Sequence, residues 1–210
     1  MSKGLFITLE GIEGAGKSTV VQHIREYFDK KKRAYVVTRE PGGTEIAEAI
    51  RHILLNHYQE KMADDTELLL FFAGRAQHIA RVIQPALVMG KMVLCDRFTD
   101  ASFAYQCGGR GIPEERVAIL EKWVQGDLQP DLTLLLDVSP EIGAARIAAR
   151  KQLDRFEIER LAFFKKVRQH YLERAIHYSN RYRIIDANQS ENEVKQAVEL
   201  LLDQEVSRNE

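Results

Sequence analysis

Residues 11 to 18 read Gly11-Ile12-Glu13-Gly14-Ala15-Gly16-Lys17-Ser18, and this stretch decides how the chain folds. It fills every fixed position of G-x-x-x-x-G-K-[ST], the loop that cradles phosphates. Its glycines permit the positive φ angles that turn backbone N–H groups toward a polyphosphate, while the lysine meets the outer phosphates and the serine hydroxyl is offered to Mg²⁺. The residues expected to bind the nucleoside triphosphate are Gly11, Glu13, Gly14, Ala15, Gly16, Lys17, Ser18 and Thr19.

The residues on either side of this loop place it between a strand and a helix. Leu5 to Leu9 form a short apolar run with β-branched members, which is typical of a buried parallel strand. After the loop, apolar residues recur at helical spacing at Val20, Val21, Ile24, Tyr27 and Phe28. A bound phosphate would therefore lie at a helix N-terminus, where backbone amides and the helix dipole favour anions.

Strands and helices are predicted to alternate along the rest of the chain. Further strands are expected at 34–38, 92–95, 132–137 and 182–186. Helices are expected from Thr44 to Leu54 with a buried stripe at Ile46, Ala49, Ile50, Ile53 and Leu54, over 66–89 with a bend near Gly74 or Pro85, over 113–125, after 139–141, through 163–171, and over 190–202. This alternation predicts one α/β domain over 1–210, a doubly wound five-stranded parallel sheet.

Composition limits the classes of partner and compartment. Thirty basic residues against thirty-one acidic ones give a net charge of −1, which argues against nucleic-acid binding and against anionic membranes. The first strand starts within a few residues of Met1, which leaves no room for a signal peptide, and no apolar run approaches the roughly 20 residues of a membrane span. Cys95 and Cys107 lack metal-ligand spacing. We expect a cytoplasmic protein with small-molecule partners.

Charged residues follow two of the predicted strands at their carboxyl ends, the edge at which open α/β sheets bind ligands. Arg39 opens the turn 40–43, and we interpret it as an anion ligand rather than a surface ion pair. Asp96 and Arg97 follow the strand 92–95, where the aspartate can hold the Mg²⁺ shell and the arginine can reach a phosphate. Asp137 is a weaker candidate for the metal.

A predicted helix offers a surface for a flat heterocycle. Phe71 and Arg75 lie four residues apart and Phe72 three residues before the arginine, so both rings share its face of the helix. The ring could stack on a base while the guanidinium bonds a ring carbonyl; the alternative is a core aromatic residue beside a salt-bridged arginine. We expect a polar pocket wall followed by a flexible link at Ser102, Tyr105, Gln106 and 108–111.

Residues 146–158 are dense in charge and lie between two predicted helices. They include Arg146, Arg150, Lys151 and Arg155. A solvated corner would explain this composition, but so would a mobile lid whose cations close over a transferring phosphate and exclude water. We favour the lid.

The phosphate loop leaves several functions open. A GTPase-type switch would carry D-x-x-G and N-K-x-D, whereas Asp96 is followed by Arg97-Phe98-Thr99 and no N-K-x-D occurs. A P-loop ATPase or switch module without a nucleotide acceptor remains the alternative. Arginines at 39, 75, 97, 110, 150 and 155 favour a small-molecule kinase, because such an enzyme must neutralise two anionic substrates brought end to end.

At these positions the chain resembles thymidylate kinase over essentially its whole length. The resemblance is carried, in order and spacing, by the P-loop preceded by Glu10, Thr38-Arg39-Glu40-Pro41-Gly42-Gly43, the Phe71 and Arg75 pair, Asp96-Arg97, Tyr105-Gln106 and Gly109-Arg110-Gly111. It implies a nucleoside monophosphate kinase fold with a helical lid. It also implies transfer of the γ-phosphate of ATP to dTMP with Mg²⁺, giving dTDP and ADP, in a cytoplasmic homodimer.

The resemblance further implies roles for single residues. Phe71 would stack on thymine, Arg75 would bond its carbonyl, and Tyr105 would crowd the ribose 2′ position. Arg39 and Arg97 would hold the dTMP phosphate, Glu13 would approach the 3′-hydroxyl, and Ser102 and Gln106 would lie at the base or its phosphate. The expected acceptor site comprises Glu13, Arg39, Pro41, Phe71, Phe72, Arg75, Arg97, Ser102, Tyr105 and Gln106.

Family members differ in whether the catalytic cation comes from the P-loop or from the lid. The variable P-loop positions here, residues 12 to 15, carry no cation, so the chain resembles the bacterial type with a basic lid. The expected catalytic residues are Lys17, Arg97, Arg150 and Arg155, and the expected metal ligands are Ser18 and Asp96. Ser102 stands where some relatives carry a longer amide.

Overall fold

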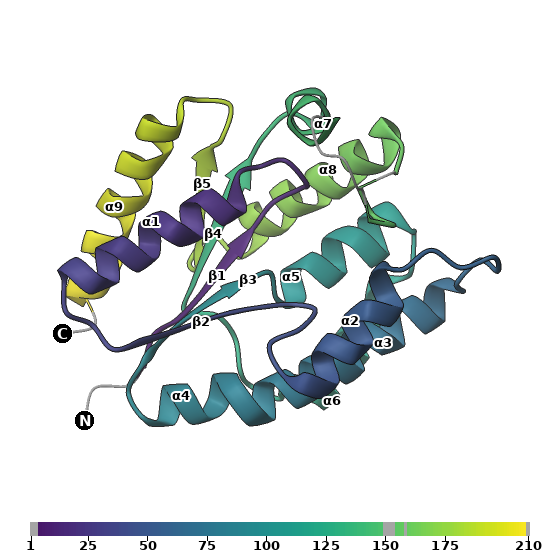
Figure 1. Cartoon of the computed structure of the whole chain (residues 1–210), viewed down its shortest axis with the longest axis horizontal. Helices are drawn as coiled ribbons and strands as arrows, with labels where there is room; N and C mark the ends of the chain where they lie inside the picture. Colours follow the sequence, from purple (N-terminus) through teal and green to yellow (C-terminus); the bar gives the residue numbers. More distant parts are fainter. Residues whose placement is uncertain (1–3, 149–153, 158, 209–210) are drawn as a thin grey trace.

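The computed structural model describes residues 4–148, 154–157 and 159–208, and their core is one parallel sheet (Figure 1). Its strands run in the order β2-β3-β1-β4-β5, with every neighbouring pair parallel. The bounds are β1 Phe6–Glu10, β2 Tyr35–Arg39, β3 Met92–Asp96, β4 Leu132–Asp137 and β5 Tyr182–Asp186. The predicted α/β fold is therefore confirmed, with each strand within one residue of its expected position.

Helices cover both faces of this sheet. Successive strand residues point to opposite faces, so Ile7 and Leu94 join the core cluster that includes α1, while their neighbours Phe6 and Val93 pack with Ile79. The α-helices are α1 Lys17–Lys30, α2 Glu45–Leu55, α3 Asp64–His78, α4 Gln84–Val88, α5 Thr99–Ser102, α6 Glu114–Gln125, α7 Pro140–Ala148, α8 Leu161–His177 and α9 Glu191–Arg208. Within the described ranges, none of them is both long and apolar enough to cross a membrane.

The long helix predicted over 66–89 begins earlier and changes its hydrogen bonding before Pro85. Regular α3 passes through Gly74 and gives way to a π-helical stretch, η1 (Ile79–Ile83), which leads into α4. In this stretch the Gln84 N–H donates to the Ile79 carbonyl, five residues back. Because proline has no N–H and its ring crowds the preceding turn, the widened turn lets the helix continue past it.

The flexible link predicted at 108–111 is wrong over its first half, because residues 99–109 are helical. Helix α5 continues into a second π-helical stretch, η2 (Phe103–Gly109), which packs along α8. A Cβ on Gly108 would lie 2.7 Å from the His170 Cβ, and one on Gly109 would lie 2.5 Å from the Phe163 ring. These glycines therefore permit close helix approach rather than flexibility.

The stripe predicted to be buried on α2 is also partly wrong. Leu54 is fully buried, but Ile46 is 56% exposed and Ile53 is 42% exposed. Ala47, which was not predicted, is fully buried instead. The helix is therefore rotated relative to the expected orientation, because its packing against α3 decides which side faces inward.

A buried ion cluster joins α5 to α8 and to the start of β5. Asp100 is 1% exposed and accepts hydrogen bonds from Arg174 Nη2 at 2.6 Å and from Arg181 Nη1 at 2.6 Å. Although burial opposes ionisation, the charge of Arg174 and the hydrogen bonds of Arg181 lower the pKa of Asp100 to about 2. The carboxylate therefore stays charged at neutral pH and neutralises part of the charge of the two buried guanidinium groups.

We predict that Asp100→Ala lowers the free energy of unfolding by about 3–5 kcal/mol, because it leaves two buried cations unpaired. Asp127→Ala is the matched control: its salt bridge to Lys122 is on the surface and its side chain is 97% exposed, so the free energy of unfolding should hardly change. Urea unfolding of both variants provides the measurement. Equal losses in the two variants would show that the buried cluster does not stabilise the fold.

Candidate active site

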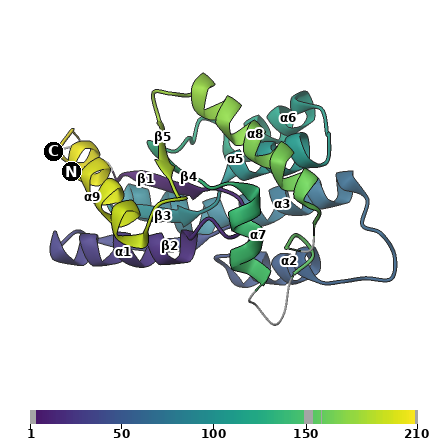
Figure 2. The same ribbon diagram turned by 90° about the horizontal axis from the view of Figure 1, so that it is seen from above.

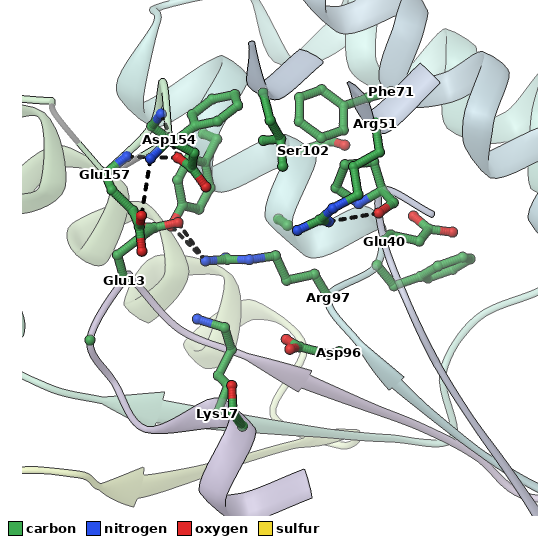
Figure 3. A pocket seen from close by; sticks show the side chains of 18 of the residues that line it. Glu13, Lys17, Glu40, Arg51, Phe71, Asp96, Arg97, Ser102, Asp154 and Glu157 are labelled. Carbon is green, nitrogen blue, oxygen red and sulfur yellow. Dashed lines mark hydrogen bonds and ion pairs between the residues drawn. The ribbon is translucent and has the colours of Figure 1, made fainter. Parts of the chain in front are cut away.

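A pocket of about 270 Å³ opens where the carboxyl ends of the strands meet the P-loop (Figure 3). It brings together segments that are far apart in the sequence: the P-loop, the turn after β2, α2, α3, the end of β3, η2 and residues 154–157. Most predicted site residues line it, namely Glu13, Gly14, Gly16, Lys17, Ser18, Thr19, Pro41, Phe71, Arg75, Asp96, Arg97, Ser102, Tyr105 and Gln106.

The P-loop has the backbone that its sequence predicts. Gly14 and Gly16 take φ angles of 76° and 90°, and a Cβ on Gly14 would lie 2.3 Å from the Gly143 carbonyl oxygen. The Lys17 Nζ donates to the carbonyl groups of Gly11 at 3.1 Å and Ile12 at 3.0 Å. Burial, together with the charge of Arg97, lowers the pKa of Lys17 to about 8, so the ammonium group remains charged at pH 7. Gly11 and Ala15 belong to the same loop but do not line the pocket.

Glu13 links the P-loop to the end of β3 and to η2. Its carboxylate accepts a hydrogen bond from Arg97 Nη2 at 2.7 Å (Figure 3). It also accepts a hydrogen bond from the Tyr105 hydroxyl, which in turn accepts one from Arg97 Nη2 at 3.0 Å. Burial raises the pKa of the Tyr105 hydroxyl well above its ordinary value, so it serves here as a neutral donor. An acid, a phenol and a cation thus meet in the middle of the pocket.

Arg75 is held in a fixed orientation with one nitrogen unpaired. Its Nε donates to Glu40 at 2.7 Å and its Nη2 donates to the Ser102 hydroxyl at 3.0 Å, while the residue is only 2% exposed. Its Nη1 is buried and has no partner among the described residues. His78 Nδ1 lies 2.9 Å from the other Glu40 oxygen. The salt bridge that the sequence left as the alternative is therefore present, and the role of Arg75 as a ligand of a base stays a prediction.

The two predicted aromatic residues of α3 occupy different places. Phe71 lines the pocket and packs at a tilt of 58° against Phe156, with ring centroids 5.9 Å apart. Phe72 lies outside the pocket in a core cluster, 2% exposed, with the guanidinium carbon of Arg75 4.5 Å from its ring centre. The expected contact of Phe72 with a substrate is thus replaced by support for Arg75.

Arg39 lies outside the pocket, so its interpretation as an anion ligand is not supported by this structure. Its Nη2 pairs with Glu48 at 3.0 Å and its side chain is 54% exposed, which is the surface ion pair that the sequence left as the alternative. Arg51 of α2 lines the pocket instead, with Nη1 donating to the Pro41 carbonyl at 2.7 Å. Sequence reasoning missed Arg51 because it stands in an ordinary amphipathic helix without a motif.

Asp96 and Ser18 provide oxygen atoms suited to Mg²⁺. Both line the pocket, and Asp96 Oδ1 is buried without a hydrogen-bond partner in the described part of the chain. Among those residues no cluster of three or more His, Cys, Asp or Glu could hold a metal. Magnesium keeps several waters and phosphate oxygens as ligands, so one or two protein oxygens fit its requirements. Asp137, the weaker candidate, pairs with Arg168 at 2.6 Å and does not line this pocket.

The lid candidates have different outcomes. Arg150 and Lys151 lie outside the described residues. Arg155 is held on the α3 side, where its Nη2 pairs with Glu67 at 2.6 Å and its Nε donates to the Leu54 carbonyl at 2.9 Å. Glu67 is 1% exposed and also accepts from Gln106 Nε2 at 2.8 Å. The structure therefore places Arg155 in an ion pair with α3, outside the residues that line the pocket, and its catalytic role stays a prediction.

Glu10 lies beneath the pocket at the end of β1 and is fully buried. Burial, reinforced by the charge of Asp100, raises the pKa of its carboxyl group from 4.5 to about 8, although Arg97 and two hydrogen bonds act in the opposite direction. The folded protein therefore keeps a proton that the unfolded chain releases near pH 4.5.

Comparison with known proteins gives a consistent result. A family model described as Thymidylate kinase matches residues 9–198. A protein of Pseudomonas entomophila named Thymidylate kinase is 58% identical over 199 residues, which is 95% of each chain. A protein of the same name from Pseudomonas savastanoi pv. phaseolicola is 57% identical over 205 residues, or 96% of each chain.

We predict that Glu10→Gln changes the pH dependence of stability. Because its folded pKa is raised, Glu10 costs stability progressively as pH rises from 4.5 to 8, at up to about 1.4 kcal/mol for each pH unit. The variant should therefore gain in free energy of unfolding relative to the natural protein between pH 5 and pH 8. Urea unfolding at several pH values measures this difference. A constant difference over that range would contradict the raised pKa.

Proposed function

This chain belongs to the thymidylate kinase family, and we propose that its pocket carries out the transfer of the γ-phosphate of ATP to dTMP, giving ADP and dTDP. The observation that carries the proposal is the joining of two half-sites in one pocket. The P-loop with Lys17 forms one half, and the base-sized recess with Phe71 and Arg75 forms the other. Arg97 lies between them, bonded to Glu13.

The acceptor half offers thymine a ring to stack on and a hydrogen-bond donor. Phe71 offers a ring for stacking, and the unpaired Nη1 of Arg75 offers a donor to a ring carbonyl. Leaving this buried nitrogen unpaired is costly, so a base with a carbonyl at that point is favoured over one without. Tyr105 and Glu13 would meet the sugar, where the tyrosine crowds the 2′ position and the acid approaches the 3′-hydroxyl.

The acceptor phosphate would meet two cations that already line the pocket. Arg97 comes from the end of β3, and Arg51 comes from α2 in the place expected for Arg39. Burial, with the neighbouring charge of Arg39, lowers the pKa of Arg51 while leaving it a cation. A phosphate held by this pair would point its oxygen toward the P-loop side of the pocket.

Phosphate transfer in this pocket needs little proton chemistry. A dTMP phosphate oxygen is already anionic near neutral pH, so the site has to align it with the γ-phosphate and spread the developing charge. Lys17 and Arg97 would supply that charge, and Ser18 and Asp96 would hold Mg²⁺, which neutralises and orients the phosphates when bound. We expect Arg150 of the lid to complete the neutralisation.

Three packed helices carry an exposed apolar face that fits a second copy of the chain. Helices α2, α3 and α6 lie together, on the opposite side of the molecule from α1 and α9 (Figure 2). Their exposed apolar side chains are Ile46, Ile53, Leu69, Ile119 and Trp123, the last 80% exposed. Large apolar and aromatic side chains that gather on one face are typical of interfaces. We propose a homodimer through this face, in the cytoplasm, where Cys95 and Cys107 would stay reduced as the free thiols seen here.

The function is tested by ADP release with a panel of acceptors. We expect turnover with dTMP far above that with UMP, dCMP or AMP; UMP and AMP carry the 2′-hydroxyl that Tyr105 would crowd, and adenine has no carbonyl for Arg75 Nη1. Lys17→Ala should lower dTMP-dependent turnover by about 10²- to 10³-fold. ATP hydrolysis that does not depend on the acceptor would instead favour a P-loop ATPase or switch without an acceptor.

The proposed dimer is tested by replacing one residue of the apolar face. Trp123→Lys places a charge among these apolar side chains, so we expect sedimentation velocity to show a shift from dimer to monomer. Leu200→Lys on α9, whose side chain is also largely exposed, is the matched control and should leave the dimer intact. If Trp123→Lys sediments as the natural protein does, this face is not the interface.

A further inference from the structure

We propose that Glu10 and Tyr171 are positioning residues that hold Arg97 in the orientation needed to receive the acceptor phosphate. The proposal rests on the proposed function of Arg97 as a phosphate ligand. Neither residue lines the pocket, and both lie immediately behind it. They act on the reaction only through the arginine.

The first contact fixes the backbone beside Arg97. Glu10 Oε1 accepts a hydrogen bond from the Phe98 N–H at 2.8 Å, and the carboxyl group is fully buried at the end of the central strand β1. Arg97 itself has a φ of 68°, in the left-handed region that non-glycine residues seldom adopt. Such a conformation persists only where its surroundings hold it, and the Glu10 bond is directly adjacent to it.

The second contact fixes the guanidinium group. Arg97 Nη1 donates to the Tyr171 hydroxyl at 3.2 Å, and this hydroxyl donates to Glu10 Oε2 at 2.7 Å. The phenol therefore uses its one donor and one acceptor position in a single chain from cation to carboxyl group. Glu10 thus reaches Arg97 twice, through the backbone of the next residue and through Tyr171.

This arrangement leaves the other side of Arg97 facing the pocket. Arg97 Nη2 contacts Glu13 and Tyr105, which both line the pocket, whereas Nη1 is turned back toward Tyr171 and the Gly11 carbonyl. Removing the Tyr171 hydroxyl would leave Nη1 with the Gly11 carbonyl as its remaining partner among those named here. The guanidinium could then rotate, and an error of about 1 Å in such a group is costly for turnover.

The test compares Tyr171→Phe with Tyr182→Phe. Tyr182 is the matched control because its hydroxyl is also buried but has no hydrogen-bond partner among the described residues. We expect Tyr171→Phe to lower kcat/KM for dTMP by roughly 10- to 100-fold. Its affinity for thymidine, which lacks the phosphate, should be unchanged in calorimetry, and Tyr182→Phe should behave as the natural protein in both assays.

A second test, made in a protein that already carries Arg97→Lys, separates a positioning role of Tyr171 from a general loss of structure. In an Arg97→Lys protein, the extra loss caused by Tyr171→Phe should disappear, because the residue acts only through the guanidinium. Glu10→Gln should lower kcat/KM for dTMP in the same direction, since an amide can accept only one of the two bonds. A full loss in the Arg97→Lys background, or an equal loss of thymidine affinity, would overturn the proposal.

A crystal structure of Tyr171→Phe supplies a readout that does not depend on the reaction. We expect the Arg97 guanidinium to be displaced while the strands keep their positions. An unmoved guanidinium would overturn the positioning role, whereas failure of the natural protein to phosphorylate dTMP would overturn only the proposed function.

Discussion

Two carboxylates, one buried and one that lines the pocket, hold the arginines of this pocket, and the site depends on those pairs. Glu40 binds Arg75, and Glu13 binds Arg97, at 2.7 Å in both cases. Burying a guanidinium group without such a partner would cost free energy. A pair whose two members came only from solvated loops would not fix the orientation of the guanidinium group. Here the acids stand on the P-loop and in the turn after β2, so the parallel sheet itself sets where the cations point.

Preorganised charge explains how a largely neutral protein can bring two polyanions together. The net charge is only −1, but several cations are gathered in one pocket, and the carboxylates paired with them offset their charge. Because these side chains are already ordered, substrate binding costs little entropy for arranging them. In the proposed reaction the same charged groups would face the transferring phosphate. Arg75 Nη1 and Asp96 Oδ1 have no hydrogen-bond partner in the part of the chain that the structure describes, and we propose that ligands bind at these two atoms.

The sequence predicted the parts of the molecule that local pattern determines. The P-loop, the five strands and the pairing of Phe71 with Arg75 on one helix face follow from periodicity and fixed spacing over a few residues. Contacts between distant segments decided the rest. Arg39 turned toward Glu48 and away from the pocket, while Arg51 entered it from a helix without a motif. Gly108 and Gly109 indicated a turn, but close packing against α8 made their segment helical.

We propose that Glu40 fixes Arg75 before the acceptor binds. The most direct measurement is a pair of high-resolution crystal structures, one of the free protein and one with dTMP. We predict that Arg75 keeps its bonds to Glu40 and Ser102 in both structures and that only Nη1 gains a partner, a carbonyl oxygen of thymine. An Arg75 that is disordered in the free protein, or that leaves Glu40 when dTMP binds, would contradict it.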